Sequence, residues 1–149
     1  MNIRRAKVEE AQFIIDFQID MAQETENVVL DRNIITPGVK AVFEDESKGW
    51  YFVAEVDGVI AGSLLITFEW SDWRNAMILW IQSVFVNKAY RGRGVYRALY
   101  GHIQQIVNGS DDYVGIRLYV DKTNTDALQV YEKLGMDSQH YGMCEWIKS

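Results

Sequence analysis

Apolar residues recur every three to four positions over residues 8–22 and again over residues 95–107, which predicts two amphipathic helices. A further helix is expected over residues 124–135, because this stretch begins with a favoured asparagine cap and ends with a glycine. A threonine, a proline and a glycine at residues 36–38 interrupt the chain. A short helix is therefore expected only after them, over residues 39–46.

Strands are expected where β-favouring residues form runs or alternate with polar ones. The segments that meet this description are residues 2–6, 51–56, 59–68, 76–86, 114–120 and 140–147. Asp57 and Gly58 separate the second and third of these segments, and this dipeptide is typical of a tight hairpin. The order of the elements indicates one mixed α/β sheet flanked by helices.

The composition is that of a single globular domain over residues 1–149, with 48% hydrophobic and 24% charged residues and no repeats. No apolar run approaches the roughly 18 residues that span a bilayer, and the first residues have no apolar signal core. Cys144 is the only cysteine, and His102 and His140 have no partner at metal-ligand spacing. We therefore expect a cytoplasmic protein with no membrane segment and no metal site.

The net charge is −6, from 15 basic and 21 acidic residues, which argues against a broad nucleic-acid surface. Four basic residues nevertheless lie close together with no acid among them: Lys88, Arg91, Arg93 and Arg97. A local cationic site on an acidic protein indicates a small anionic ligand.

The loop from Arg91 to Gly94 lies between an expected strand and an expected helix. Its glycines let backbone N–H groups turn inward as an anion nest, and its arginines can reach phosphate oxygens in bidentate fashion. This chemistry fits a diphosphate, although the loop is neither a Walker loop nor a dinucleotide-binding motif. The alternative interpretation is an ordinary strand-to-helix turn with solvated arginines.

Two motifs in register resemble those of the GNAT (GCN5-related N-acetyltransferase) family. The first is Q/R-x-x-G-x-G/A, where Arg91 and Gly94 match and Tyr96 replaces the usual small residue. The second is Asn-x-x-Ala-x-x-x-Tyr-x-x-x-Gly-aromatic, matched by Asn124, Ala127, Tyr131 and Gly135, with Met136 in place of the aromatic residue. The resemblance implies a central, mostly antiparallel sheet flanked by helices, and acetyl-CoA as the cosubstrate.

The resemblance also implies where acetyl-CoA binds. The pantetheine arm is expected to add like another strand along the backbone of Val84, Phe85 and Val86. The diphosphate is expected on the loop and the helix start, formed by Arg91, Gly92, Arg93, Gly94, Val95, Tyr96 and Arg97. Asn124 matches a position that contacts the cofactor arm, although capping a helix is an equally sufficient role for it.

Tyr131 resembles the tyrosine that gives a proton or hydrogen bond to the departing thiolate, and its alternative role is core packing. The attacking amine must lose a proton, and a related branch of the family has a glutamate for this where the chain has Gln82. An amide is not a base, so the proton is expected to pass to Glu69, Asp72 or solvent. Further carboxylates are weaker candidates, each with a plain surface role as its alternative: Glu24, Glu26 and Glu145.

The resemblance therefore implies an acetyl-CoA-dependent N-acetyltransferase that acts on a primary amine, with a small molecule as the expected acceptor. The alternatives are a non-catalytic acyl-CoA-binding or sensing module, motivated by Gln82, and a protein lysine or N-terminal acetylase. Trp70, Trp73 and Trp80 surround the turn before the cofactor strand. They can form an aromatic wall for a cationic amine, ordinary sheet core, or the surface of a homodimer.

Overall fold

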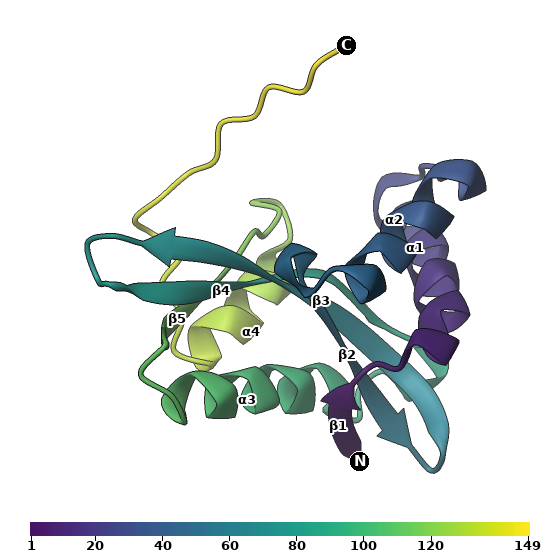
Figure 1. The fold of residues 1–149 in the computed structure, drawn as a ribbon, viewed down its shortest axis with the longest axis horizontal. Coiled ribbons are helices and arrows are strands. Elements are labelled where there is room, and N and C mark those ends of the chain that lie inside the picture. The colour runs from purple at the N-terminus through teal and green to yellow at the C-terminus, as the bar shows by residue number, and fades with distance from the viewer. The chain divides into compact units, whose positions relative to one another are not determined.

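The computed structural model describes all residues from Met1 to Ser149 and contains one five-stranded sheet (Figure 1). The strands lie in chain order: β1 (Asn2–Arg5), β2 (Trp50–Val56), β3 (Val59–Ser71), β4 (Ala76–Val86) and β5 (Tyr113–Leu118). Neighbouring strands are antiparallel from β1 to β4, and β5 runs parallel to β4. The predicted mixed, mostly antiparallel sheet is therefore confirmed.

The chain has four α-helices: α1 (Ala11–Glu26), α2 (Arg32–Glu44), α3 (Val95–Asn108) and α4 (Thr125–Lys133). The first two cover one face, where α1, α2 and β2 share a buried cluster formed by Ala11, Ile14, Ile15, Val39, Tyr51 and Val53. Phe52 points to the opposite face, because side chains alternate along a strand, and its ring lies 5.5 Å from that of His102 in α3. Helices thus flank the sheet on both faces (Figure 1). None of the four has the length and apolar character of a membrane span.

The Asp57–Gly58 dipeptide forms the hairpin turn between β2 and β3, as predicted. Both residues have positive φ angles, 51° and 78°, which are the values that a type I′ turn needs. The first helix also matches its prediction, except that residues 8–10 form a single 3₁₀ turn and α1 then continues to Glu26.

The second helix differs from its prediction, because α2 passes through Pro37 instead of beginning after Gly38. The Asp31 carboxylate caps it by accepting a hydrogen bond of 2.8 Å from the Asn33 amide. Apolar residues on both sides of the proline, Ile35 before it and Val39 after it, pack into the same cluster with α1. The burial of this continuous face outweighs the one helical hydrogen bond that proline removes.

The chain divides into two compact units, Met1–Leu118 and Tyr119–Ser149. In the second unit, Asn124 caps α4 by accepting a 3.0 Å hydrogen bond from the Ala127 amide, and Gly135 follows the helix with a φ of 86°. The strand predicted over residues 140–147 is wrong, because the chain after α4 has no regular structure. Alternation predicts which side chains share a face, but a strand also needs a hydrogen-bonded partner strand, and residues 140–147 pair with none.

Gly62 allows β3 to approach the end of β4. It pairs with Val86, and a Cβ atom added to it lies 2.8 Å from the carbonyl oxygen of Phe85. We therefore expect Gly62→Ala to lower the free energy of unfolding by about 1–3 kcal/mol, as overpacking does. Gly115→Ala in β5 is the matched control, since a Cβ atom there meets nothing within 4 Å. Equal denaturant midpoints for the two variants would contradict the predicted crowding at Gly62.

Candidate functional site

The last part of β4 has one side that no strand covers. β5 pairs with β4 only as far as Ile81, which lies opposite Leu118. Just beyond, Ser83 and Val84 together oppose a single β3 residue, and Ser83 has a left-handed φ of 54°. Such a bulge bends its strand and disrupts pairing. From Gln82 to Val86, the side of β4 away from β3 is therefore open to a further extended chain or ligand; we call it the open edge.

The far end of the open edge is already occupied by a side chain. The amide of Asn87 donates to the carbonyl of Ala61 in β3 over 2.8 Å. The carbonyl of Val86 belongs to the same peptide group, so it points the opposite way, toward the open edge. It accepts a 2.9 Å hydrogen bond from Nε of Arg91.

The loop that follows β4 opens onto the start of α3. Gly92 and Gly94 have left-handed φ angles of 75° and 77°, and nothing lies within 4 Å of a Cβ atom added to either. The first amide with a helical acceptor is that of Ala98, which donates to the carbonyl of Gly94 over 3.0 Å. A helix start of this kind directs N–H groups and positive potential toward the loop. The loop thus has the space and the polarity of an anion site.

The side chains around this loop have different partners. Val95 is buried in the core, and the ring of Tyr96 stacks against that of Tyr100 one helical turn on. Its side chain therefore lies along α3. The guanidinium of Arg93 lies 5.3 Å from the ring of Tyr90, and that of Arg97 is exposed.

Arg91 forms a bidentate ion pair with Glu24, with Nη1–Oε1 and Nη2–Oε2 distances of 2.5 and 2.9 Å. These hydrogen bonds, with the positive charge of Lys88 nearby, lower the pKa of Glu24, which is therefore ionised at neutral pH. Glu24 is thus a partner of the loop and a poor candidate for a base. The cluster of basic residues expected from the sequence therefore includes a neutralising carboxylate, that of Glu24, which lies 67 positions before Arg91 in the chain.

The face of the sheet beside the open edge is a polar platform. It consists of Thr67 and Glu69 on β3, Trp80 and Gln82 on β4, and Arg117 on β5, which the strand register places on one face. The Gln82 amide donates to Thr67 Oγ1 over 2.9 Å, and Trp80 Nε1 donates to Glu69 over 3.1 Å. Arg117 also pairs with Glu69. Two donors thus hold the carboxylate that the sequence offered as a base.

The turn between β3 and β4 places Asp72 beyond the platform. Its carboxylate accepts a 2.9 Å hydrogen bond from the Trp73 amide. Trp70 and Trp73 are 58% and 90% exposed, which excludes ordinary sheet core as the explanation for these two rings. Trp80 alone of the three belongs to the platform.

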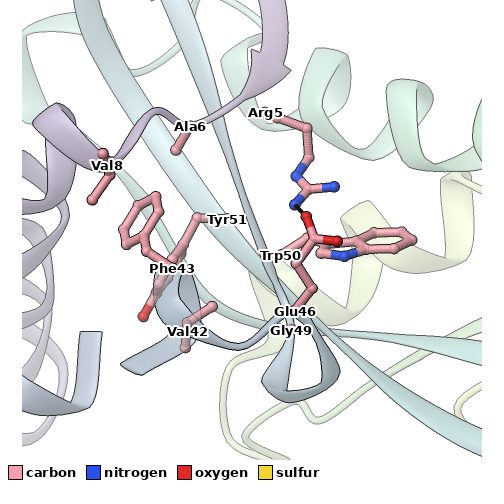
Figure 2. Close-up of a pocket in the computed structure, with 9 residues that line it drawn as sticks. All are labelled: Arg5, Ala6, Val8, Val42, Phe43, Glu46, Gly49, Trp50 and Tyr51. Carbon is pink, nitrogen blue, oxygen red and sulfur yellow. Dashed lines mark hydrogen bonds and ion pairs between the residues drawn. The ribbon is translucent and has the colours of Figure 1, made fainter. Parts of the chain in front are cut away.

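A pocket of about 230 Å³ lies elsewhere, at the end of β1 and the start of β2 (Figure 2). Arg5 and Glu46 form an ion pair of 2.9 Å at its wall, and Phe43 and Tyr51 line its apolar side. None of the residues predicted for the site lines it. Because its two charges neutralise each other and β3 separates its strands from β4, we place the candidate site at the open edge instead.

The two predicted site residues of the second unit are both on α4. Asn124 is the helix cap, which satisfies its structural role. Tyr131 lies in the last turns of the helix and is half-buried. Their proposed contacts with cofactor and thiolate remain predictions.

Three members of the site have no recognisable signal in the sequence. Arg117 and Thr67 look like ordinary polar strand residues until the register brings them to Glu69 and Gln82. Ser83 is the third, since a left-handed serine inside a strand has no local signature.

The acetyltransferase (GNAT) family model matches residues 12–136, which span the open edge, the loop and α4. The chain belongs to the GNAT family. Among curated proteins, none matches it. A possible acetyltransferase from Clostridium difficile 630 is similar, with 41% identity over 99% of this chain and 97% of that one, and a TM-score of 0.93.

More distant structures share the GNAT fold with this chain. A ribosomal-protein-alanine N-acetyltransferase from Brucella melitensis biovar Abortus 2308 has 14% identity and a TM-score of 0.79, over 99% of this chain and all of that one. A transcriptional regulator from Bacillus halodurans C-125 has 22% identity and a TM-score of 0.81, over 98% and 99% of the two chains. At these identities the likeness concerns the fold alone. The GNAT family membership supports a transferase.

Proposed function

We propose that this protein is an acetyl-CoA-dependent N-acetyltransferase that acts on the primary amine of a small molecule. The observation that carries the proposal is the open edge of β4, followed directly by the loop of Gly92 and Gly94. Members of the GNAT family generally use acetyl-CoA. When bound, acetyl-CoA supplies the thioester carbonyl that an amine attacks.

The residues present fit acetyl-CoA at two places. The peptide groups of Val84 and Phe85 lie on the stretch of β4 that no strand covers, where a pantetheine arm with its amides can pair as another strand does. The glycines leave space beside the amides at the start of α3, which suits a diphosphate. Val86 contributes less than the sequence suggested, because its carbonyl already accepts from Arg91.

The platform is the proposed place for the acceptor amine. The hydroxyl of Thr67 fixes the side chain of Gln82 by accepting a hydrogen bond from its amide nitrogen. The amide oxygen of Gln82 is therefore the atom that can accept a hydrogen bond from an amine or a water. The carboxylate of Glu69 is held in position by the indole N–H of Trp80 and by the guanidinium of Arg117. Tyr131 is the proposed donor to the departing thiolate, because a phenol can lend a proton without ionising beforehand at neutral pH.

The second candidate is a module that binds acyl-CoA without catalysis. Gln82, an amide in the place of an expected base, and the occupied carboxylate of Glu69 favour it. Both candidates bind acetyl-CoA, and only the enzyme releases free thiol when an acceptor is supplied. A panel of polyamines, amino acids, aminoglycosides and peptides, assayed by thiol release, separates them and also tests a protein acetylase.

Once an acceptor is found, Glu69→Gln and Asp72→Asn locate the base. We expect the larger loss of kcat/KM for Glu69→Gln, about tenfold at neutral pH, since Glu69 lies on the platform with Gln82 and bulk water can partly replace it. The loss shrinks at high pH, because more of the amine is already neutral. Gln82→Glu in the Glu69→Gln background should restore activity at neutral pH. Wild-type pH profiles for both single variants would assign the proton to water and leave Gln82 to position the acceptor.

A further inference from the structure

We propose that Arg91 is a positioning residue whose counter-ion is Glu24, and that Arg97 is the arginine that meets the diphosphate of acetyl-CoA. This inference rests on the proposed function. It separates Arg91, whose charge Glu24 neutralises, from the other three basic residues of the group, of which Arg97 stands in the first turn of α3. It also assigns Glu24, whose surface position suggested no partner, to the cofactor site.

The contacts of Arg91 hold three elements together. Three of its five N–H groups are used, two on the Glu24 carboxylate at the end of α1 and one on the carbonyl of Val86 at the end of β4. The backbone of Arg91 begins the loop that leads to Gly94. We call this arrangement the clasp. A bidentate, charge-assisted pair constrains direction as well as distance, so the clasp fixes the loop relative to α1 and β4.

An apolar contact lies beneath the clasp and keeps α1 in place. The guanidinium of Arg91 lies 5.6 Å from the ring centroid of Phe85 on β4. That ring in turn lies 5.0 Å from the ring of Phe17 on α1, and both phenylalanines are buried. Phe17 and Phe85 therefore hold the body of α1 against β4, while Glu24 controls only the last turn and the loop. Loss of the ion pair should loosen the loop without unfolding the protein.

Arg91 and Arg97 differ in whether an acid neutralises their charge. Glu24 neutralises Arg91 at neutral pH, whereas no acid pairs with Arg97, which is exposed in the first turn of α3. Arg97 thus adds a full positive charge where the helix start already favours an anion. Lys88 and Arg93 are the remaining cations of the group. Lys88 lies close enough to Glu24 to lower the pKa of that carboxyl, and the guanidinium of Arg93 lies 5.3 Å from the ring centroid of Tyr90, outside the first turn of α3.

The sign of one substitution tests the clasp. We expect Glu24→Gln to weaken acetyl-CoA binding about three- to fivefold, measured by calorimetry, because the loop loses its fixed position. If Arg91 instead served as a phosphate ligand restrained by Glu24, the same change would free it and tighten binding. Asp20→Asn is the matched control: it removes a carboxylate from the same helix, and Asp20 is exposed. The control should leave the Kd unchanged.

The dependence of the acetyl-CoA Kd on ionic strength reports the charges that meet the ligand, and a loosened loop alone does not change it. The double variant Glu24→Gln/Arg91→Gln keeps the net charge, so its acetyl-CoA Kd should rise several-fold yet keep the wild-type dependence on ionic strength. Arg97→Gln should flatten that dependence. A flattened dependence in the double variant, or an unaltered one in Arg97→Gln, would overturn the assignment.

Two further measurements keep the outcomes distinct. Melting temperatures of all variants within a few degrees of wild type are expected, because Phe17 and Phe85 stay in place. Wild-type protein that fails to bind acetyl-CoA contradicts the proposed function itself. Wild-type binding combined with tighter binding by Glu24→Gln contradicts only the clasp.

Discussion

Tyr131→Phe is expected to lower kcat on the order of a hundredfold, which is the usual contribution of a general acid. The hydroxyl acts only as negative charge develops on the leaving thiolate, so the affinity for acetyl-CoA should hardly change. The two quantities are measured separately, kcat by thiol release with a saturating acceptor and Kd by calorimetry. The phenylalanine keeps the aromatic ring of the tyrosine on α4, and a thermal melt checks that the variant folds.

Tyr141→Phe is the control for this experiment. It removes one hydroxyl from the same unit of the chain, and the side chain of Tyr141 is 74% exposed. Wild-type kcat is expected for the control. Equal turnover of Tyr131→Phe and wild type, where chemistry limits the rate, would reduce Tyr131 to a packing residue.

Gly94→Asp is expected to weaken acetyl-CoA binding by more than about tenfold, equivalent to about 1.4 kcal/mol. The new carboxylate stands at the N-cap of α3, beside the amides that are proposed to hold the diphosphate. It competes for those amides as a cap does, and it repels the phosphates as a like charge.

Gly94→Asn separates charge from backbone strain. Asparagine has the same shape as aspartate and also tolerates the left-handed φ of 77° that Gly94 adopts. Both variants should therefore fold, and Gly94→Asn should bind acetyl-CoA more tightly than Gly94→Asp. Identical affinities of the folded Asp and Asn variants would mean that no anion binds at this turn.

Short-range chemistry predicted the parts of the fold that depend on neighbours in sequence. Asp57 and Gly58 specify their turn by their own φ preferences, and Asn124 caps α4 through an amide three residues away. The same holds for the loop, where Gly94 adopts the left-handed conformation that starts α3. Such features need no knowledge of the rest of the chain.

The features that the sequence did not predict depend on residues that are far apart in the chain. Pro37 indicated a break, and only the shared cluster with α1 shows why α2 continues through it. The alternation over residues 140–147 indicated a strand, but alternation does not supply a partner, and these residues pair with no strand. Glu24 lies 67 positions from Arg91, and no local pattern could have joined them.

A strand that offers unpaired N–H and C=O groups to a small molecule offers them equally to another polypeptide. Within the segment from Gln82 to Val86, Val84 and Phe85 favour β-structure and are uncharged, whereas the bulge at Ser83 and the Arg91 side chain on the Val86 carbonyl confine such pairing to a short stretch. The empty protein is therefore expected to be prone to aggregation at this strand, and a bound ligand to mask it. The concentration of ligand would then control the lifetime of the protein in solution as well as its rate of turnover.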